Sequence, residues 1–457
     1  MDLAKALGQS SDVSFNQAKE LLEQGQYIEA VKALIVCIDN DRSNHEAFCL
    51  LGDVYIAAGQ NMQAVENYGQ AVMLCPKERK YKQKLVDSAA GLTFKKINPN
   101  LKGVLIECFD SDDVHISRCG NLWLSIISTD PQLKPFYSLS KHKSYGAFKK
   151  AMDAFSLCDA LIEPLFLIGL GKFYVPKSDF ERWVTHLRRY FLDVITQGRI
   201  VFSDAEDTEL MACALLKHHY FTDYISSVSE EEQAAVACFK KEILSGDQPE
   251  LSKLAILGCY KPLCLLDNAK DIAKNLQGGD HVSQIPKSQI EDYWAQQEIK
   301  NSIPVLKEIS SDVSKSVQDQ YEEFPYPRWI VASRDILNEK IEGYLSGTSA
   351  NILNAGCGTG QEAIMLAYAF PDAQITAVDL SKTSLAYAEF KARQLGIKNV
   401  RFMQADIMDI GTLDQKFDYI ASSGVLHHMD DPKAGWEVLN GLLKPKGLMR
   451  IALYSRQ

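Results

Sequence analysis

The chain has 457 residues, of which 46% are apolar and 24% are charged, and its formal net charge is −10. This length exceeds what one hydrophobic core supports, so several domains are expected. The acidic balance argues against nucleic acid as the main partner, because phosphate binding requires a basic surface. The eleven cysteines contain no CxxC pair, which predicts buried thiols in a reducing compartment rather than disulfides or a zinc site.

The N-terminal residues 1–5 lack the basic start and the long apolar stretch of a signal peptide. The most apolar run, residues 161–175, is interrupted by Glu163, Pro164 and Lys172, and it is too short to span a bilayer. These features predict a cytoplasmic protein without a membrane partner.

Residues 11–44 align with residues 45–78 at a period of 34. In the second copy, Gly52 is small where paired helices approach closely, and Tyr68 fills the space beside it. This pattern falls on the tetratricopeptide signature, so residues 1–98 are predicted to form a short α-solenoid with a capping helix. Such an array offers a groove to a protein or peptide. The alternative is a scaffold for folding or for a homodimer.

Residues 99–285 carry apolar side chains at helical spacing and no recognisable catalytic pattern, which predicts an all-α middle domain. His218 and His219 lie side by side in it, but no third ligand follows at a metal-like spacing. No metal site is therefore predicted. The glycines within residues 277–280 indicate a linker, and residues 286–347 are predicted as a helical lead-in to the last domain.

An aromatic segment with two prolines, residues 320–329, lies within this lead-in. Tyr321, Tyr326, Arg328 and Trp329 are predicted to form a lid whose rings exclude water and face a cation. The alternative is that the prolines stiffen a connector whose aromatic rings pack on the domain.

The last domain, residues 348–457, opens with an apolar strand that runs into glycines at alternate positions, Gly356, Gly358 and Gly360. Such a turn lets the backbone approach a ligand, because a side chain at any of these positions would occupy the space or forbid the dihedral angles. Further strand signals follow at residues 374–378, 400–404 and 417–421, each one strand–helix unit after the last. A parallel α/β sheet is predicted.

Acidic residues follow two of these strands. Asp379 ends the second strand, where its carboxylate can accept hydrogen bonds from both ribose hydroxyls of an adenosine. Asp406 follows the third strand and is placed to accept a hydrogen bond from an adenine amino group, with Leu380 and Ile407 on either side of the ring. The loop after the fourth strand is expected to floor the reaction centre.

A nicotinamide or flavin enzyme is the competing interpretation, and its turn reads Gly-x-Gly-x-x-Gly. Here the spacing is Gly-x-Gly-x-Gly, and Gln361 stands where the last glycine of that motif belongs. An acidic residue after the third strand is also unnecessary for a dinucleotide. The pattern therefore favours S-adenosylmethionine over NAD.

Residues 351–454 resemble the class I S-adenosylmethionine-dependent methyltransferases, through Ala-Gly-Cys-Gly-Thr-Gly, Val-Asp-Leu-Ser, Gln-Ala-Asp-Ile and Gly-Val-Leu-His-His. Residues 320–329 resemble the segment that precedes this domain in tetratricopeptide-fused methyltransferases. The resemblance implies a Rossmann-like domain that transfers a methyl group to a protein, a peptide or a small molecule. The cofactor contacts are expected at Asn354, Gly356, Cys357, Gly358, Gly360, Gln361, Asp379, Leu380, Asp406, Ile407, Ser423 and Gly424.

Two departures from this family pattern stand out. Asn354 opens the turn where most class I enzymes carry Asp or Glu, so a carboxylate near a cationic cofactor is missing. The chain also stops at Gln457, three residues after the predicted fifth strand at 448–454, whereas class I domains add two further strands. We expect a truncated sheet whose fifth strand is an exposed edge or is covered by something else. A repeat scaffold with a catalytically silent module is therefore the alternative to an enzyme.

Methyl transfer requires little of the protein beyond placing the acceptor and excluding water, because the cofactor carries the activated group. Where the acceptor arrives protonated, a nearby base helps. His427 and His428, with an ordinary pKa of about 6.5, are the candidates. Adjacent residues do not both face one ligand comfortably, so one of the two is expected to be structural.

Overall fold

The computed structural model describes residues 11–155, 161–199, 202, 204–245, 250–276, 282–333 and 339–453. Contacts within the chain divide it into two compact units, residues 1–286 and residues 287–457. The linker predicted at 277–280 and the last residue of the predicted fifth strand, Tyr454, lie outside the described residues. No helix in the described ranges combines the length and the apolar character needed to cross a membrane.

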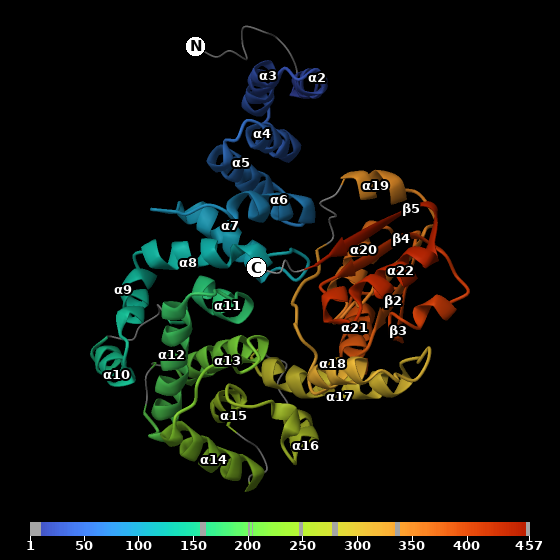
Figure 1. Cartoon of the computed structure of the whole chain (residues 1–457). Coiled ribbons are helices and arrows are strands. Elements are labelled where there is room, and N and C mark those ends of the chain that lie inside the picture. Colours follow the sequence, from blue (N-terminus) through green and yellow to red (C-terminus); the bar gives the residue numbers. More distant parts are fainter. Residues whose placement is uncertain are drawn as a thin grey trace. The chain divides into compact units, whose positions relative to one another are not determined.

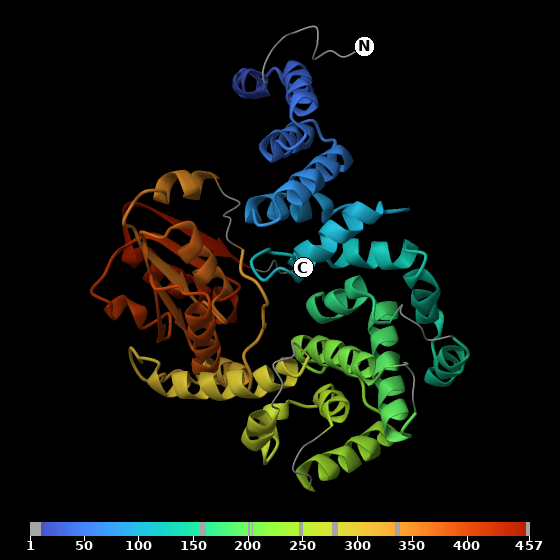
Figure 2. The same ribbon diagram turned by 180° about the vertical axis from the view of Figure 1, so that it is seen from behind.

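The first helices of unit 1 pack one against the next, as Figures 1 and 2 both show in blue. They are α2 (Ser11–Glu23), α3 (Tyr27–Asn40), α4 (His45–Ala57), α5 (Asn61–Leu74) and α6 (Arg79–Ala89). α2 and α4 begin 34 residues apart, as do α3 and α5, so the helices keep the period of the sequence. A Cβ atom on Gly52 would lie 2.5 Å from the ring of Tyr68, and this close approach explains why a glycine stands there.

The remaining described helices of unit 1 pack around a core rich in aromatic side chains, including Trp123, Phe166 and Trp183. They are α7 (Pro99–Asp110), η1 (Ser117–Cys119), α8 (Gly120–Thr129), α9 (Leu133–Tyr137), η2 (Ser138–Lys141), α10 (Tyr145–Ala154), α11 (Pro164–Lys172), α12 (Ser178–Thr196), α13 (Ala205–Phe221), α14 (Glu230–Ser245), α15 (Leu251–Gly258), η3 (Leu263–Leu265) and α16 (Ala269–Asn275).

His218 and His219 lie in α13 and are both buried. Burial lowers the pKa of His218 to about 4, so its ring is neutral at pH 7, and its Nδ1 lies 3.0 Å from the carbonyl oxygen of Leu170. Among the residues that the structure describes, no group of three or more His, Cys, Asp or Glu is arranged to hold a metal ion. The histidine pair is therefore a packed pair within the helical core.

Unit 2 is a parallel sheet with helices on both faces. Its elements are α17 (Gln284–Ser302, which begins just before the unit), α18 (Asp312–Glu322), α19 (Glu339–Leu345), β1 (Asn351–Ala355), α20 (Gln361–Ala369), β2 (Gln374–Asp379), α21 (Lys382–Gln394), β3 (Val400–Gln404), η4 (Ile410–Thr412), β4 (Phe417–Ser423), η5 (Leu426–His428), α22 (Pro432–Leu442) and β5 (Leu443–Ala452). The strand order is β3-β2-β1-β4-β5, and every pairing is parallel.

Alternate residues of each strand enter two separate cores. Ile352 of β1 packs on the face covered by α20 and α21, while its neighbour Leu353 packs on the face covered by α22. The chain leaves the sheet in opposite directions from β1, toward β2 on one side and toward β4 on the other. A crevice opens at such a switch point beyond the carboxyl ends of the strands, which is where α/β proteins bind ligands.

The strand boundaries follow the sequence for β1, β2 and β3, and β4 continues two residues further, to Ser423. β5 begins five residues earlier than expected, at Leu443, and its ladder with β4 is irregular between Phe417 and Tyr419. Within the described residues β5 pairs with β4 alone, and its side chains are partly or fully exposed. Among the described residues of this unit, no further strand pairs with its outer edge.

Candidate cofactor site

A cavity of about 840 Å³ lies at the carboxyl ends of the strands of unit 2. It is lined by the glycine turn, by the residues that follow β2, β3 and β4, and by one side of α18. Its lining residues include Ser310, Ser311, Val313, Ser314, Val317, Gln318, Tyr321, Tyr326, Gly356, Cys357, Gly358, Gln361, Glu362, Asp379, Leu380, Asp406, Ile407, Ser423, Gly424, Val425, His428 and Met429. The size suits a small-molecule ligand.

The glycine turn presents bare backbone to this cavity. Gly356 has a φ of +71°, and a Cβ atom on it would lie 2.3 Å from Val425, so no larger residue fits. Gly358 has a φ of +51°, and a Cβ atom on it would meet nothing within 4 Å, which is open space toward the cavity. The turn is therefore a cradle that a ligand can approach closely.

Asp379 connects the turn to the start of α21. Its Oδ2 accepts a hydrogen bond from Gly358 N at 2.7 Å, and its Oδ1 accepts one from Ser381 N at 3.0 Å. Burial raises the pKa of Asp379 above its usual range, although the backbone N–H donors act in the opposite direction. Each carboxylate oxygen retains a lone pair for a donor on a ligand, as the predicted ribose contact requires.

Asp406 also lines the cavity, two residues beyond the end of β3, and is buried. Its Oδ1 accepts a hydrogen bond from Met408 N at 2.9 Å, and its Oδ2 accepts one from Ser314 Oγ at 2.5 Å. Leu380 and Ile407 also line the cavity, as expected for residues that flank a flat ring. Ser314 brings α18 into contact with this carboxylate, and no motif in the sequence pointed to it.

Only half of the predicted lid faces the cavity. Tyr321 and Tyr326 line it, whereas Arg328 and Trp329 are not among the lining residues. Trp329 is buried, and its Nε1 donates to the carbonyl oxygen of Thr359 at 2.9 Å. The indole of Trp329 packs in the domain core and contacts the glycine turn from outside the cavity, which for this residue agrees with the alternative of a connector whose rings pack on the domain.

The C-terminal end of α18 is anchored to the start of α21 by Glu322. Lys382 N donates to Glu322 Oε1 at 2.9 Å, Thr383 Oγ1 donates to Oε2 at 2.9 Å, and Lys300 Nζ lies 2.5 Å from Oε2. Burial alone would raise the pKa of Glu322, but the hydrogen bonds from Lys300 and Thr383 outweigh it and hold the pKa below its usual range. The lead-in is thus attached to the helix that follows Asp379.

The two histidines differ in position. His428 lines the cavity and His427 does not, although their ring centroids are only 4.1 Å apart. Burial, together with the neighbouring His428, lowers the pKa of His427. His428 is therefore the one that a ligand in the cavity can reach. Cys357 also lines the cavity, and burial raises the pKa of its thiol well above the usual value, so the thiol stays neutral.

Among the described lining residues, six are Asp or Glu and none is Lys or Arg. The acidic members are Glu362, Asp379, Asp406, Asp409, Asp430 and Asp431. Such a wall favours a positively charged ligand. Together with the glycine cradle, this donor and acceptor set fits an adenosyl group that carries a sulfonium.

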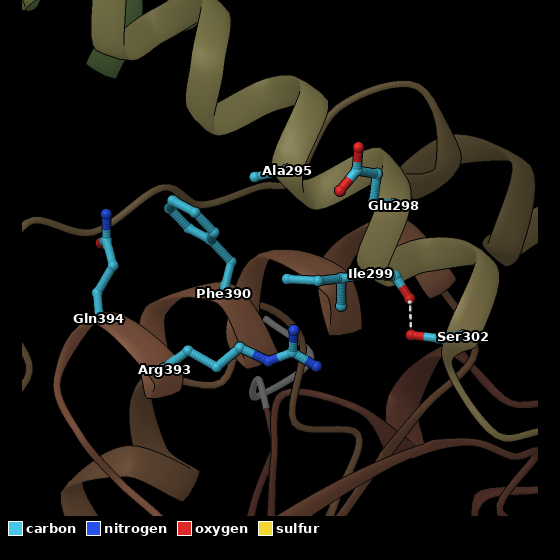
Figure 3. Close-up of a pocket in the computed structure, with 7 residues that line it drawn as sticks. All are labelled: Ala295, Glu298, Ile299, Ser302, Phe390, Arg393 and Gln394. Carbon is cyan, nitrogen blue, oxygen red and sulfur yellow. Dashed lines mark hydrogen bonds between the residues drawn. The ribbon is translucent and has the colours of Figure 1, made fainter.

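A second, smaller cavity of about 350 Å³ lies between α17 and α21, and Figure 3 shows it in close-up. It is lined by Ala295, Glu298, Ile299, Ser302, Phe390, Arg393 and Gln394. It shares no residue with the large cavity and contains no part of the glycine turn. The large cavity is therefore the candidate cofactor site.

Two residues expected at the cofactor do not line the cavity. Gly360 has a φ of +80° and caps α20, and a Cβ atom on it would lie 2.4 Å from Ala388, so it serves helix packing. Asn354 is 1% exposed and lies behind the wall. Glu362, by contrast, lines the cavity although no motif pointed to it, and it is the single acidic residue of α20.

Residues 347–457 match the family model described as a methyltransferase domain. Over 112 residues the chain is 35% identical to malonyl-[acyl-carrier protein] O-methyltransferase of Bacillus anthracis, a match that covers 24% of this chain and 39% of that protein. It is 32% identical over 103 residues to an uncharacterized methyltransferase of Mycobacterium tuberculosis, covering 22% of this chain and 50% of the relative. Residues 347–457 form a methyltransferase domain. Its cofactor is S-adenosylmethionine.

Other similar proteins match a comparable share of the chain. An uncharacterized protein of Synechococcus is 40% identical over 105 residues, which are 23% of this chain and 25% of that protein. Among solved structures, PKMT2 from Rickettsia typhi in complex with AdoHcy is 31% identical, with a TM-score of 0.23, and the match covers 25% of this chain and 24% of that one. The chain thus spans half or less of the length of each relative named here.

Proposed function

We propose that this protein is an S-adenosylmethionine-dependent methyltransferase whose acceptor is a protein or a peptide, with a small molecule as the alternative acceptor. The observation that carries the proposal is that the glycine turn, Asp379, Asp406 and His428 line one cavity at the switch point of the sheet. When bound, the cofactor supplies a methyl group activated by its sulfonium.

The residues of the chain then bind, orient and exclude water. Asp379 accepts hydrogen bonds from the ribose, Asp406 accepts one from the adenine amino group, and Gly358 leaves room for the methionine portion. Tyr321 and Tyr326 line the cavity on the side of the lead-in, where they keep water out. His428 takes the proton of an acceptor that arrives as a protonated amine or a hydroxyl.

The preference for a protein acceptor rests on the tetratricopeptide-like repeat of the first helices, which is typical of proteins that bind peptides. On this interpretation the repeat groove holds part of the acceptor, and the location is cytoplasmic. The competing proposal is a repeat scaffold whose methyltransferase module is silent, and the feature that favours it is that, among the described residues, β5 pairs with β4 alone and has exposed side chains.

Label transfer separates these proposals. The full chain is incubated with a cell extract and S-adenosylmethionine carrying a radioactive methyl group, beside the variant Asp379→Ala. Label that enters a protein band with the wild type and is lost with the variant supports the protein methyltransferase. Label in the low-mass fraction supports a small-molecule acceptor. Cofactor binding by calorimetry without any labelled product supports the silent scaffold, and binding of NAD in its place contradicts the assignment.

A further inference from the structure

A row of residues crosses the sheet behind the glycine turn. Parallel pairing places Asn354 of β1 beside Ala421 of β4, and Ala421 beside Arg450 of β5. Residues paired in neighbouring strands project from the same face of a sheet. Asn354 and Arg450 therefore lie on one face with only the small Ala421 between them, at the point where the sheet topology reverses.

Glu362, in the first turn of α20, lies over this row. Its Oε2 accepts a hydrogen bond from Asn354 Nδ2 at 3.3 Å, and its Oε1 pairs with the guanidinium of Arg450. Arg450 also donates to Ser423 Oγ at 3.1 Å. Glu362 and Ser423 line the cavity, whereas Asn354 and Arg450 lie behind it. One carboxylate at the cavity wall is thus held from two strands.

The amide of Asn354 has a defined orientation, because its Nδ2 donates both to Glu362 and to the carbonyl oxygen of Ala421, at 3.3 Å each. Its Oδ1 is consequently left without a hydrogen-bond donor among the described residues, although the side chain is 1% exposed. A buried acceptor without a donor is uncommon, and a ligand or an ordered water normally satisfies it. The buried Oδ1 of Asn354 therefore lacks a hydrogen-bond donor among the described residues.

We propose that Glu362 is the carboxylate that binds the α-ammonium of the cofactor, and that Asn354 and Arg450 are its positioning residues. This inference rests on the proposed function. The charge that Asn354 does not carry at the start of the turn is supplied by Glu362, eight positions later along the chain. Arg450 holds that carboxylate at the cavity wall through their ion pair, and the ammonium supplies the missing donor, directly or through a water.

A purely local role makes a different prediction. An acidic residue in the first turn of a helix interacts favourably with the helix dipole, and a partly exposed ion pair adds little to the stability of the fold. If that were all, replacing Glu362 would change the affinity for every adenosyl ligand by the same factor, because none of these effects depends on an ammonium group.

The test is calorimetric titration of the full chain with three ligands. S-adenosylhomocysteine carries the ammonium without the sulfonium charge, its desamino analogue lacks the ammonium, and 5′-methylthioadenosine lacks the whole amino-acid portion. Glu362→Gln is expected to lower the affinity for S-adenosylhomocysteine by about tenfold or more, as loss of a charged hydrogen bond does. The affinities for the other two ligands are expected to stay within about twofold of the wild type. Retained binding of 5′-methylthioadenosine shows that the variant is folded.

Arg450→Met is expected to lower the affinity for S-adenosylhomocysteine selectively, though by less than Glu362→Gln does. Arg450→Lys is expected to retain part of the affinity that Arg450→Met loses. Glu437→Gln serves as the matched control, because Glu437 lies on α22 in an exposed ion pair with Lys433 and does not line the cavity. An equal loss for all three ligands, or no loss for any of them, overturns the inference. A wild-type chain that binds none of the three overturns the cofactor assignment itself, so the two failures are distinguishable.

Discussion

At the scale of single residues, the site depends on one carboxylate held by backbone donors. Asp379 accepts hydrogen bonds from Gly358 N and Ser381 N and lines the cavity. Asp379→Ala is expected to lower the affinity for S-adenosylmethionine by about 10- to 100-fold, because hydrogen bonds to a charged group contribute about 1.5–3 kcal/mol. Calorimetric titration measures the change. Asp414→Ala, on an exposed loop outside the cavity, is the control and is expected to bind as the wild type does.

Two glycines of the turn are expected to matter for different reasons, Gly356 for packing in the domain and Gly358 for access of the ligand. Gly356→Ala is expected to destabilise the domain by about 2–4 kcal/mol, because the new Cβ atom meets Val425 at 2.3 Å and φ is +71°. The Cβ atom of Gly358→Ala meets no atom within 4 Å, so this change is expected to destabilise the domain only through its strained backbone, by about 1–2 kcal/mol. It is also expected to weaken cofactor binding, because the new methyl group occupies part of the cavity. Thermal unfolding and titration of both variants measure these effects. Similar unfolding midpoints for the two would contradict this distinction.

The two histidines give a comparison at neighbouring positions. His428→Ala is expected to reduce the methyl-transfer rate by about 100-fold or more where the acceptor needs a base, with little change in cofactor affinity, because His428 lines the cavity. His427→Ala is expected to retain the rate, because His427 does not line it. The rate of label transfer at saturating cofactor measures both. The assignment of the base fails if the two variants lose equal activity.

At the scale of elements, α18 lines the candidate cofactor cavity although it precedes the sheet in the sequence. Ser314 contacts Asp406 near one end of the helix, and Glu322 contacts Lys300 and α21 at the other. The sequence placed an aromatic segment here and predicted a lid. In the structure, two polar residues of the helix make hydrogen bonds to the sheet domain. The hydroxyl of Ser314 donates to Asp406, and the carboxylate of Glu322 accepts from the first residues of α21.

The contacts that Glu322 makes with Lys300 and the start of α21 are expected to depend on pH. Its pKa is held below the usual value of about 4.3, so its hydrogen bonds stabilise the folded protein at neutral pH, and this stabilisation is lost as the pH falls through the lowered pKa. Glu322→Gln is expected to unfold at a lower temperature than the wild type at pH 7, and the difference is expected to shrink toward pH 3. Glu323→Gln, at an exposed neighbouring position, is the control. A difference that does not change with pH would contradict the role of the carboxylate.

At the scale of the whole molecule, every residue that lines the cavity belongs to unit 2. A fragment comprising residues 282–457, which keeps α17 whole, is therefore expected to bind S-adenosylmethionine within about threefold of the full chain. If the repeat helices hold the acceptor, the same fragment loses protein labelling in a cell extract while it keeps the cofactor. Titration and label transfer on the two chains measure this. Equal labelling by both would show that the repeats do not present the acceptor.

The sequence by itself determined the local elements and the identity of the cofactor class. The helical repeat with a period of 34, the apolar run of β1 and the spacing of Gly356 and Gly358 are patterns that can be recognised in the sequence without knowledge of the tertiary contacts. The position of Asp379 and Asp406 at one cavity was also predictable, because the carboxyl ends of parallel strands meet at the same edge of the sheet.

The tertiary structure alone decided which residues complete the site. Ser314 and Asp406 are 92 positions apart, and Arg450 and Glu362 are 88 apart, so only the pairing of strands and the packing of helices brings them together. The same holds for Trp329, whose place in the core instead of over the cavity depends on its contacts with Thr359 and Tyr387. Local patterns fix elements because hydrogen bonding and side-chain periodicity act over a few residues, whereas a binding wall is assembled by contacts between elements distant in the chain.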